Sequence, residues 1–553
     1  MQTVALVLAY LVCAGHGWRV QSAAQRLRST AGKRQLDRER VQIASSLDPS
    51  NRLARLLLGI DLAAAPVQGI RSSEARMTAA AESTREAEVD SWLVRAASAS
   101  PPPSSLLESV REAAAKELPS LRFPQSRDEA WRRFDLSLLR KASVITPAPA
   151  STDVLKALLA GCSNATAAAG MRLVLVDGVY NAELSDLTAL PADVYVGSLR
   201  DAGGDALKGT LEILERELPE AHADPNTALG CHAFATLNHA SLADVVSVWV
   251  PAGVSVELPL HVISLSTSAV NDVKPEDMDK SGVPDTLSMS NPSLIVTLGD
   301  KSSLALLQTY AGSTGGYFVN ALSRFELGSG ASLEHSYVQE QAADAVHIDS
   351  LLVEASEDSA FNSQMLQSGG RAARVNVQVR LGGRGATSSL QGLTLASEKQ
   401  LSDTRTMQVH AAPGCRSSQE LRNALGGSSH VIFKGGVRVP FGSDQTETDQ
   451  MIRTLLLSDK ARADVAPTME IDTDDVMCKH GATIADLDDE MVLYLQARGV
   501  SRSDARALLL KGWAISALDH VPDPGARARA AEKAASLTFK NQQSPLRGQF
   551  SSI

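Results

Sequence analysis

Short apolar runs alternate with turns rich in Gly, Ser and Asp from about residue 230 to 485, and no amphipathic helical pattern interrupts them. Each run has the length and composition of a β-strand. A similar phrase follows four of the runs: LGDKSSL at Leu298, LGSGASL at Leu327, ASEDSAF at Ala355 and LGGRGAT at Leu381, at intervals of 29, 28 and 26 residues. Regular intervals in the twenties favour a β-helix, in which each coil buries its inner face against the next. A β-sandwich is the alternative, since it also joins short strands by turns.

The region before these runs, from about residue 80 to 220, has a mixed and helix-rich pattern. STREAEVDSWLVRAASAS predicts a helix that ends at three consecutive prolines, and SSLLESVREAAAKEL predicts the next helix. RLVLVDGVY, from Arg172 to Tyr180, predicts a strand that runs into a glycine turn.

Two helices are predicted after the strand region. The first begins near Asp488 and ends at Gly499, a glycine of the kind that follows a helix C-terminus. The second begins at Ser501, whose spacing to Asp504 suits an N-terminal cap. Its apolar surface is wider than one core-facing stripe needs. The helix is therefore either well buried within its own domain or a docking site for another protein.

The N-terminus has the pattern of a targeting leader. Thr3–Ala14 is a 12-residue apolar run that matches the hydrophobic region of a signal peptide. From Arg19 to Arg55 there are nine basic residues and three acidic ones, as in a transit peptide. Signal followed by transit predicts a plastid (chloroplast stroma) reached through the secretory route, and a secreted protein with a basic pro-segment is the alternative. No later run reaches 18 apolar residues, so no membrane span is predicted.

Length and composition predict a protein with several folded units and an aliphatic core. The chain has 553 residues, 44% of them hydrophobic but only 4% aromatic. A net charge of −10 argues against nucleic-acid binding, which needs a clustered basic surface. The predicted organisation is a signal peptide (1–17), a basic leader (18–65), an N-terminal helix-rich mixed domain (66–220), a β-helix core (221–465), a C-terminal signature and helical domain (466–521) and a polar tail (522–553).

Several kinds of chemistry are excluded by what the sequence lacks. Of five cysteines, one lies in the predicted signal peptide, and no CxxC occurs among the others, which argues against a structural zinc site or a self-contained Fe–S site. Scattered cysteines in a chain of this size are typical of free thiols in a reducing compartment. No GxxxxGK[ST] motif is present, so the chain is not predicted to hydrolyse ATP itself. No GxSxG or HExxH motif is present either.

The stretch DDVMCKHGAT contains the strongest candidate chemistry. If it is extended, Cys478 and His480 project from the same face, roughly 7 Å apart. Two ligands cannot close a tetrahedral metal site, so the others would come from elsewhere, for example a second chain. Lys479 and a protonated His480 would favour the thiolate, whereas Asp474 and Asp475 would oppose it. A Cys–His nucleophile pair and a purely structural role are the alternatives.

The long stretch around this motif resembles a known family signature. TLLLSDKARADVAPTMEIDTDDVMCKHGAT, Thr454 to Thr483, resembles the C-terminal signature of the SufB/SufD family, scaffold proteins of SUF iron–sulfur cluster assembly. The chain resembles SufD rather than SufB in its CKHGAT stretch and in the block around Trp131. It also lacks the cysteine-rich motif that SufB members commonly have near the N-terminus. The resemblance covers residues 80 to 521 and includes DEAWRRFDLSLL, LVLVDGVYNAELSDL, FATLNHASLAD and DTRTMQVHAAPGCRSSQ.

The resemblance implies a fold and a set of partners. The fold would be a right-handed parallel β-helix flanked by helical domains. Such a subunit pairs with a SufB-like subunit through the β-helix, and a transient iron–sulfur cluster forms at their interface, with His480 and then Cys478 as the residues contributed by this chain. The C-terminal helices would dock a SufC-like ABC-type ATPase through Leu509, Leu510 and Trp513, and only that partner would bind ATP.

A SufD-like subunit would be a non-enzymatic scaffold that holds no cluster by itself, and its partners would include neither nucleic acid nor membrane. The sequence departs from the family pattern at Lys479, where a small Ser is common, and at FKGG (Phe433–Gly436), which replaces Phe-Asn-Gly. Two other functions stay open. One is a thiol-dependent enzyme that uses Cys478 with His480, and the other is a β-solenoid interaction protein without metal chemistry.

Overall fold

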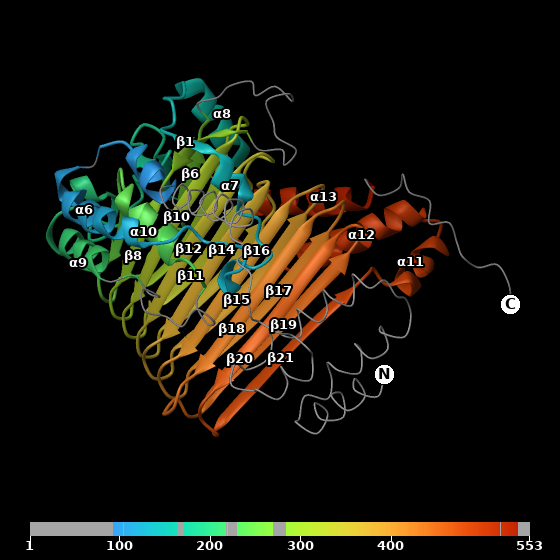
Figure 1. Ribbon diagram of the computed structural model, residues 1–553. Helices are drawn as coiled ribbons and strands as arrows, with labels where there is room; N and C mark the ends of the chain where they lie inside the picture. The colour runs from blue at the N-terminus through green and yellow to red at the C-terminus, as the bar shows by residue number, and fades with distance from the viewer. Residues whose placement is uncertain are drawn as a thin grey trace, which may run out of the picture. The chain divides into compact units, whose positions relative to one another are not determined.

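From residue 293 onward, strands that follow one another along the chain alternate between two sheets, in which nearly all neighbours are parallel (Figure 1). Sheet A contains, in chain order, β4 (Tyr195–Ser198), β5 (Val246–Val250), β8 (Ser293–Leu298), β10 (Tyr317–Leu327), β12 (Val346–Ala355), β14 (Ala372–Leu381), β16 (Leu401–His410), β18 (His430–Val439) and β20 (Arg462–Ile471). In the same sheet β7 (Thr286–Ser290) also pairs with β10, and β1 (Ser143–Ile145) pairs with β7. Sheet B contains β2 (Met171–Val176), β3 (Val179–Tyr180), β6 (Leu260–Ser266), β9 (Ser303–Gly312), β11 (Ser332–Gln339), β13 (Ala360–Gln367), β15 (Thr387–Ala396), β17 (Arg416–Leu425), β19 (Thr446–Leu456) and β21 (Val476–Ala485).

This computed structural model describes residues 92–102, 104–162, 171–216, 218, 229–268, 284–519, 521 and 523–539, all within the unit Ser83–Ile553. The predicted signal peptide (1–17) and basic leader (18–65) lie outside the described residues. No helix in the described ranges is long and apolar enough to cross a membrane.

The strand pairing makes a parallel β-helix, as predicted. Within the described residues, β8–β9 through β20–β21 form seven successive coils. The four recurrent phrases begin on the last residues of β8, β10, β12 and β14, and these residues stack in register: Leu298 pairs with Leu327, Leu327 with Ala355, and Ala355 with Leu381. The repeat interval is therefore the length of one coil. At Gly299, which begins the first of these turns, a Cβ atom would lie 2.4 Å from the backbone nitrogen of Ala252 in the preceding coil.

The interior between the two sheets changes character along the stack. In β14 the inward positions are Val375, Val377 and Val379, which belong to the aliphatic core. In β16 the residues in register with them are Thr404, Thr406 and Gln408, and all three are buried. The inward positions thus change from valines in β14 to polar residues in β16.

N-terminal helices cover the outer face of sheet A (Figure 1). α10 (His232–Ala240) packs against α6 (Glu108–Glu117) and β10, and residues 92–98 are also helical, as predicted. The contacts are aromatic: Phe234 lies 5.2 Å from Trp131 and 6.2 Å from Phe318 between ring centroids. α9 (Gly204–Glu215) packs against β5 and β8, α8 (Thr152–Cys162) lies on sheet B, and α7 (Ser137–Lys141) belongs to the aromatic cluster.

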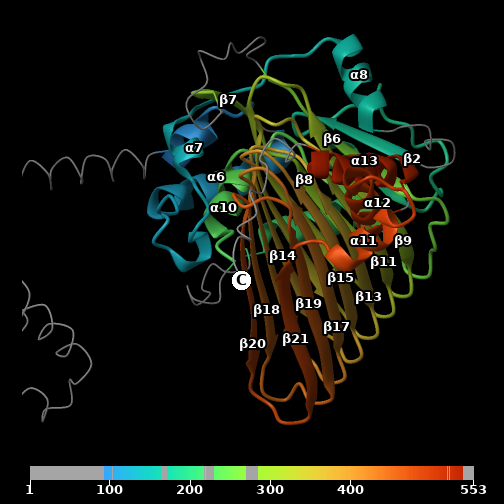
Figure 2. The ribbon, with the colours of Figure 1, turned by 90° about the vertical axis from the view of Figure 1, so that its right-hand side faces the viewer.

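The C-terminal helices α11 (Asp489–Gln496) and α12 (Arg502–Ile515) begin where predicted, and α11 ends before Gly499 as predicted. The Ser501 Oγ accepts a hydrogen bond from the backbone N–H of Asp504 at 3.2 Å, and Gly499 has φ 87°. α12 and α13 (Pro524–Phe539) pack together on the outer face of sheet B (Figure 2).

The tail differs from the expectation, because part of the segment expected to be a polar tail forms α13. Ala526, Ala530 and Ala534, spaced four residues apart, are fully buried, and Leu537 continues this face. Alanine carries little apolar surface, so the composition reads as polar, yet its helical spacing gives a narrow face that can approach a sheet closely.

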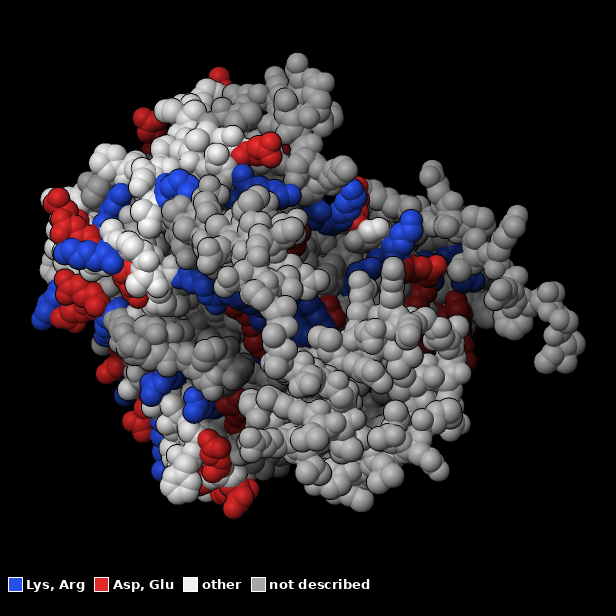
Figure 3. Space-filling model, in the orientation of Figure 1, with Lys and Arg blue, Asp and Glu red and all other residues white. Residues whose placement is uncertain are grey.

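Charged side chains of both signs are mixed on the described surface. On the face seen in Figure 3, Lys and Arg side chains lie among Asp and Glu side chains. Ion pairs such as Arg216–Glu326 at 2.9 Å and Arg380–Glu354 at 3.3 Å join neighbouring positions. These partly exposed pairs contribute little to stability.

Candidate functional site at the open end of the β-helix

The last coil leaves both sheets with an uncovered edge. β20 pairs only with β18 and β21 only with β19 among the described strands, although each is ten residues long. Figure 2 shows both strands at the end of the stack. Apolar side chains are exposed along this edge, at Ile471, Met477 and Ile484. A long edge strand with exposed apolar residues is a surface that pairs readily with another chain.

Cys478 and His480 lie on β21 and continue two interior rows onto this uncovered layer. Cys478 pairs in register with Thr448, and His480 with Gln450; both partners are buried. Since side chains alternate between the faces of a strand, Cys478 and His480 share the inward face. Cys478 is half-buried and His480 is exposed. The extended conformation expected from the sequence is confirmed, and the role of the two residues stays a prediction.

Lys479 lies on the opposite face of the strand from the candidate site. It pairs in register with Asp449 and lines a hollow on the outer face of sheet B together with Arg416 and Glu447. Burial raises the pKa of the Cys478 thiol, so its surroundings disfavour the thiolate. The departure from the family pattern at Lys479 therefore affects the outer surface rather than the inward one.

The facing strand adds no titratable ligand to the site. The positions of β20 in register with the interior of β18 are Val465, Pro467 and Met469. In the part of the chain that the structure describes, no group of three or more His, Cys, Asp or Glu residues could hold a metal ion. The two predicted ligands, Cys478 and His480, are fewer than the four that a tetrahedral metal site needs.

Hydrogen-bonded polar rows lie beneath the two residues. His410 Nε2 lies 2.8 Å from Ser417 Oγ, which lies 2.8 Å from Thr448 Oγ1 below Cys478. A second row, of side-chain amides, ends below His480. Sequence reasoning missed both rows, because polar residues at alternate positions of a strand look like a solvent-exposed face.

The three predicted docking residues on α12 occupy different environments. Leu510 is fully buried, with 0% exposure, in the cluster between the C-terminal helices and sheet B. Leu509 is half-buried, as is Trp513, whose ring lies 5.7 Å from the Arg422 guanidinium. Leu510 is therefore part of the core rather than of an accessible surface. The exposed apolar residues of α11 and α12 are Met491, Leu493, Tyr494, Leu508 and Ile515.

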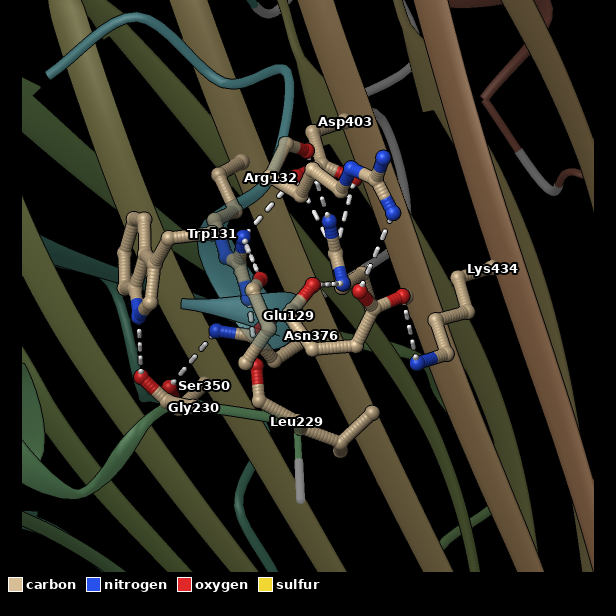
Figure 4. A network of polar contacts seen from close by, with 12 residues as sticks. Glu129, Trp131, Arg132, Leu229, Gly230, Ser350, Asn376, Asp403 and Lys434 are labelled. Atoms are coloured by element: carbon tan, nitrogen blue, oxygen red, sulfur yellow. Dashed lines mark hydrogen bonds and ion pairs between the residues drawn. The ribbon is translucent and has the colours of Figure 1, made fainter. Parts of the chain in front are cut away.

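Two of the resembling stretches meet in one buried network on sheet A (Figure 4). Arg374 donates to Asp403 Oδ2 at 2.9 Å, and both side chains are fully buried. The Arg374 guanidinium also lies 3.8 Å from the centre of the Trp131 ring, and Arg405 Nε donates to Asp403 at 3.1 Å. The Trp131 block and the DTRT stretch thus fasten the N-terminal domain to the β-helix, which is a structural role.

The FKGG stretch, which departs from the family pattern, has one residue on the outer face of sheet A and one facing the interior of the β-helix. Lys434 forms an ion pair with Glu129 at 3.6 Å on the outer face. Gly435 lies against an interior amide, since a Cβ atom there would be 2.2 Å from Gln450 Nε2. The first glycine of the phrase therefore leaves room for Gln450.

The fold and the open end define the class: a mainly β protein built on a parallel β-helix with helical regions at both ends. Residues 280–513 match the SufBD core domain of SUF-system FeS cluster assembly, and residues 98–262 match the SufBD protein N-terminal region. The chain belongs to the SufBD family of iron–sulfur cluster assembly proteins.

Curated relatives include other members of this family. The iron–sulfur cluster assembly SufBD family protein slr0076 of Synechocystis is 28% identical over 427 residues, which is 76% of this chain and 88% of the relative. Protein ABCI7, chloroplastic, of Arabidopsis thaliana is 26% identical over 442 residues, 78% of this chain and 86% of the relative. The iron–sulfur cluster assembly protein SufD of Escherichia coli is 28% identical over 212 residues, 38% of this chain and 49% of the relative.

Proposed function

We propose that this chain is a SufD-type scaffold subunit that builds iron–sulfur clusters at an interface with a SufB-like subunit. One observation supports the proposal most strongly: Cys478 and His480, too few ligands to complete a metal site, lie on the inward face of an edge strand that is paired on one side only. A second subunit that paired with β20 and β21 would cover the exposed apolar residues and supply the missing ligands.

The nascent cluster is cargo at this interface, and no cluster is held by this chain alone. His480 would offer a ring nitrogen to iron, and Cys478 would offer its sulfur. Because burial raises the pKa of the Cys478 thiol, iron binding there must be accompanied by loss of the thiol proton. The same raised pKa weakens the alternative of a thiol-dependent enzyme, which requires a reactive thiolate at neutral pH.

The ATPase partner would dock on the C-terminal helices. The chain has no phosphate-binding GxxxxGK[ST] motif, so ATP would be bound by a SufC-like partner. Leu508 and Ile515 are exposed and seven residues apart, which places them on one face of α12, and Met491 and Tyr494 are exposed on the neighbouring α11. Leu509 and the half-buried Trp513 would border this surface, with Leu510 supporting it from beneath.

A plastid is the proposed compartment. The sequence pattern of residues 1–65 predicts a signal followed by a transit leader, and one relative that matches over most of its length is named chloroplastic. Free cysteines agree with a reducing compartment, since Cys162, Cys231, Cys415 and Cys478 form no disulfide among themselves.

Reconstitution with SufB-like and SufC-like partners tests the site. His480→Ala should lower the yield of assembled cluster while subunit association, measured by size-exclusion chromatography, is kept. Lys479→Ala is the matched control, because it changes the neighbouring residue on the outer face of the same strand. Equal cluster yields from wild type and His480→Ala, or an equal loss in both variants, would contradict the proposed role.

A further inference from the structure

A row of side-chain amides in the later coils ends directly beneath His480. Gln419 on β17 pairs in register with Gln450 on β19, and Gln450 pairs with His480 on β21. Gln450 Nε2 donates to Gln419 Oε1 at 2.7 Å, and Gln419 Nε2 donates to Thr406 Oγ1 at 2.8 Å. The amide nitrogen of Gln450 is therefore directed toward the preceding coil and away from the open end.

The carbonyl oxygen of Gln450 has no partner within the described chain. Gln450 is 0% exposed, and its Oε1 is a buried atom without a hydrogen bond. The nitrogen and oxygen of an amide point in different directions, so with Nε2 turned to Gln419 the oxygen faces the next layer, which is that of His480. A buried acceptor without a donor costs about 1–3 kcal/mol, so hydrogen bonding to Gln419 alone does not account for a glutamine here.

The surroundings are shaped to hold this side chain in place. On the facing sheet, a Cβ atom at Gly435 would lie 2.2 Å from Gln450 Nε2, so Gly435 leaves the space that this amide occupies. Neighbouring strands are about 4.8 Å apart, which brings a glutamine oxygen within reach of an imidazole stacked on it in register. Gln450 is thus a fixed acceptor directed at the His480 layer.

We propose that Gln450 is a positioning residue for His480. When the exposed imidazole of His480 turns toward the interior, the unpartnered Oε1 of Gln450 accepts a hydrogen bond from one ring N–H, and the other ring nitrogen is left as the acceptor that faces the open end. A hydrogen bond to one nitrogen of an imidazole fixes its tautomer and ring orientation, as is common for histidines that bind metals. This inference rests on the proposed function, in which that second nitrogen meets the iron of the nascent cluster.

Nitrogen NMR of the full chain labelled with ¹⁵N-histidine tests the proposal without any cluster. His480→Ala identifies the signals of His480. At neutral pH the wild type should show one dominant tautomer of His480, and Gln450→Leu should give a mixture of both. Gln408→Leu is the matched control, because it removes a buried interior amide whose hydrogen bond goes to Ser388, outside this row, and it should keep the single tautomer.

Two results would overturn the proposal. The first is an even mixture of tautomers in the wild-type chain, which requires no variant to fold. The second is a single tautomer that persists in Gln450→Leu, or in Gln450→Met where the leucine variant gives too little folded protein. A failure of the proposed function would instead appear as normal cluster yield from His480→Ala, and the tautomer measurement would be unaffected by it.

Discussion

Replacing Arg374 with methionine should loosen the Trp131 segment from sheet A. Arg374 and Asp403 are both fully buried and 2.9 Å apart, and the guanidinium also donates to the Ala130 carbonyl at 2.7 Å. Methionine keeps most of the side-chain volume but leaves the Asp403 carboxylate with Arg405 as its only remaining cationic neighbour among the pairs described. The variant also removes the stacking of the guanidinium on Trp131.

The cost follows from burial. Removing one partner of a buried ion pair typically destabilises by about 3–5 kcal/mol. Because Arg405 still pairs with Asp403, the lower end of about 3 kcal/mol is expected, which is on the order of a 100-fold rise in local opening. Arg380→Met is the matched control: its pair with Glu354 is partly exposed, so less than about 1 kcal/mol is expected.

Hydrogen exchange measures this opening locally. The backbone N–H groups of Trp131 and Phe134 are hydrogen-bonded within the segment, at 2.9 and 3.2 Å, and report on its release. Their exchange should accelerate on the order of 100-fold in Arg374→Met and less than about 5-fold in Arg380→Met. Equal exchange in the two variants would show that the buried network does not hold the N-terminal domain in place.

Three further predictions concern other parts of the chain. Leu508→Asp with Ile515→Asp should weaken capture of a SufC-like ATPase at least tenfold with unchanged circular dichroism, since both side chains are exposed; undiminished binding would place the docking surface elsewhere. Cys478 should react slowly with iodoacetamide at pH 7 and faster as the pH rises toward its raised pKa, so rapid labelling at pH 7 would contradict the burial of the thiol. Burial raises the pKa of Asp349 to about 6 from 3.8, so the folded state binds the proton more tightly than the unfolded state and loses stability as the pH rises through this interval. Asp349→Asn should therefore melt at a higher temperature than wild type at pH 7, and the difference should be smaller at pH 5. A difference in melting temperature that does not change with pH would refute this.

The architecture could be predicted because a β-helix repeats its length. Leu298, Leu327, Ala355 and Leu381 must stack at the same corner of successive coils, so the spacing in the sequence equals the geometry in space. Helix ends were equally readable, since Ser501 and Gly499 act on backbone groups next to them. These patterns are local or periodic in the sequence, so they can be recognised without knowing which segments pack together.

Features that depend on packing partners could not be read from the sequence. The sequence favours Leu510 as a surface residue, yet sheet B covers it and leaves Leu508 exposed, because the rotation of α12 is set by the sheet. The inward direction of Gln450 is likewise invisible, since polar residues at alternate strand positions predict solvent. The placement of Lys479 on the opposite face from Cys478, by contrast, could be predicted, because adjacent residues of a strand point to opposite faces.

Iron and sulfide analysis of the purified full chain, alone and with a SufB-like subunit, tests the central claim most directly. The claim is that Cys478 and His480 are part of a coordination sphere which a neighbour completes. After anaerobic reconstitution and desalting, the chain alone should retain no stoichiometric cluster, and the pair should retain one that depends on His480. A stoichiometric iron–sulfur cluster held by the chain alone would contradict the account.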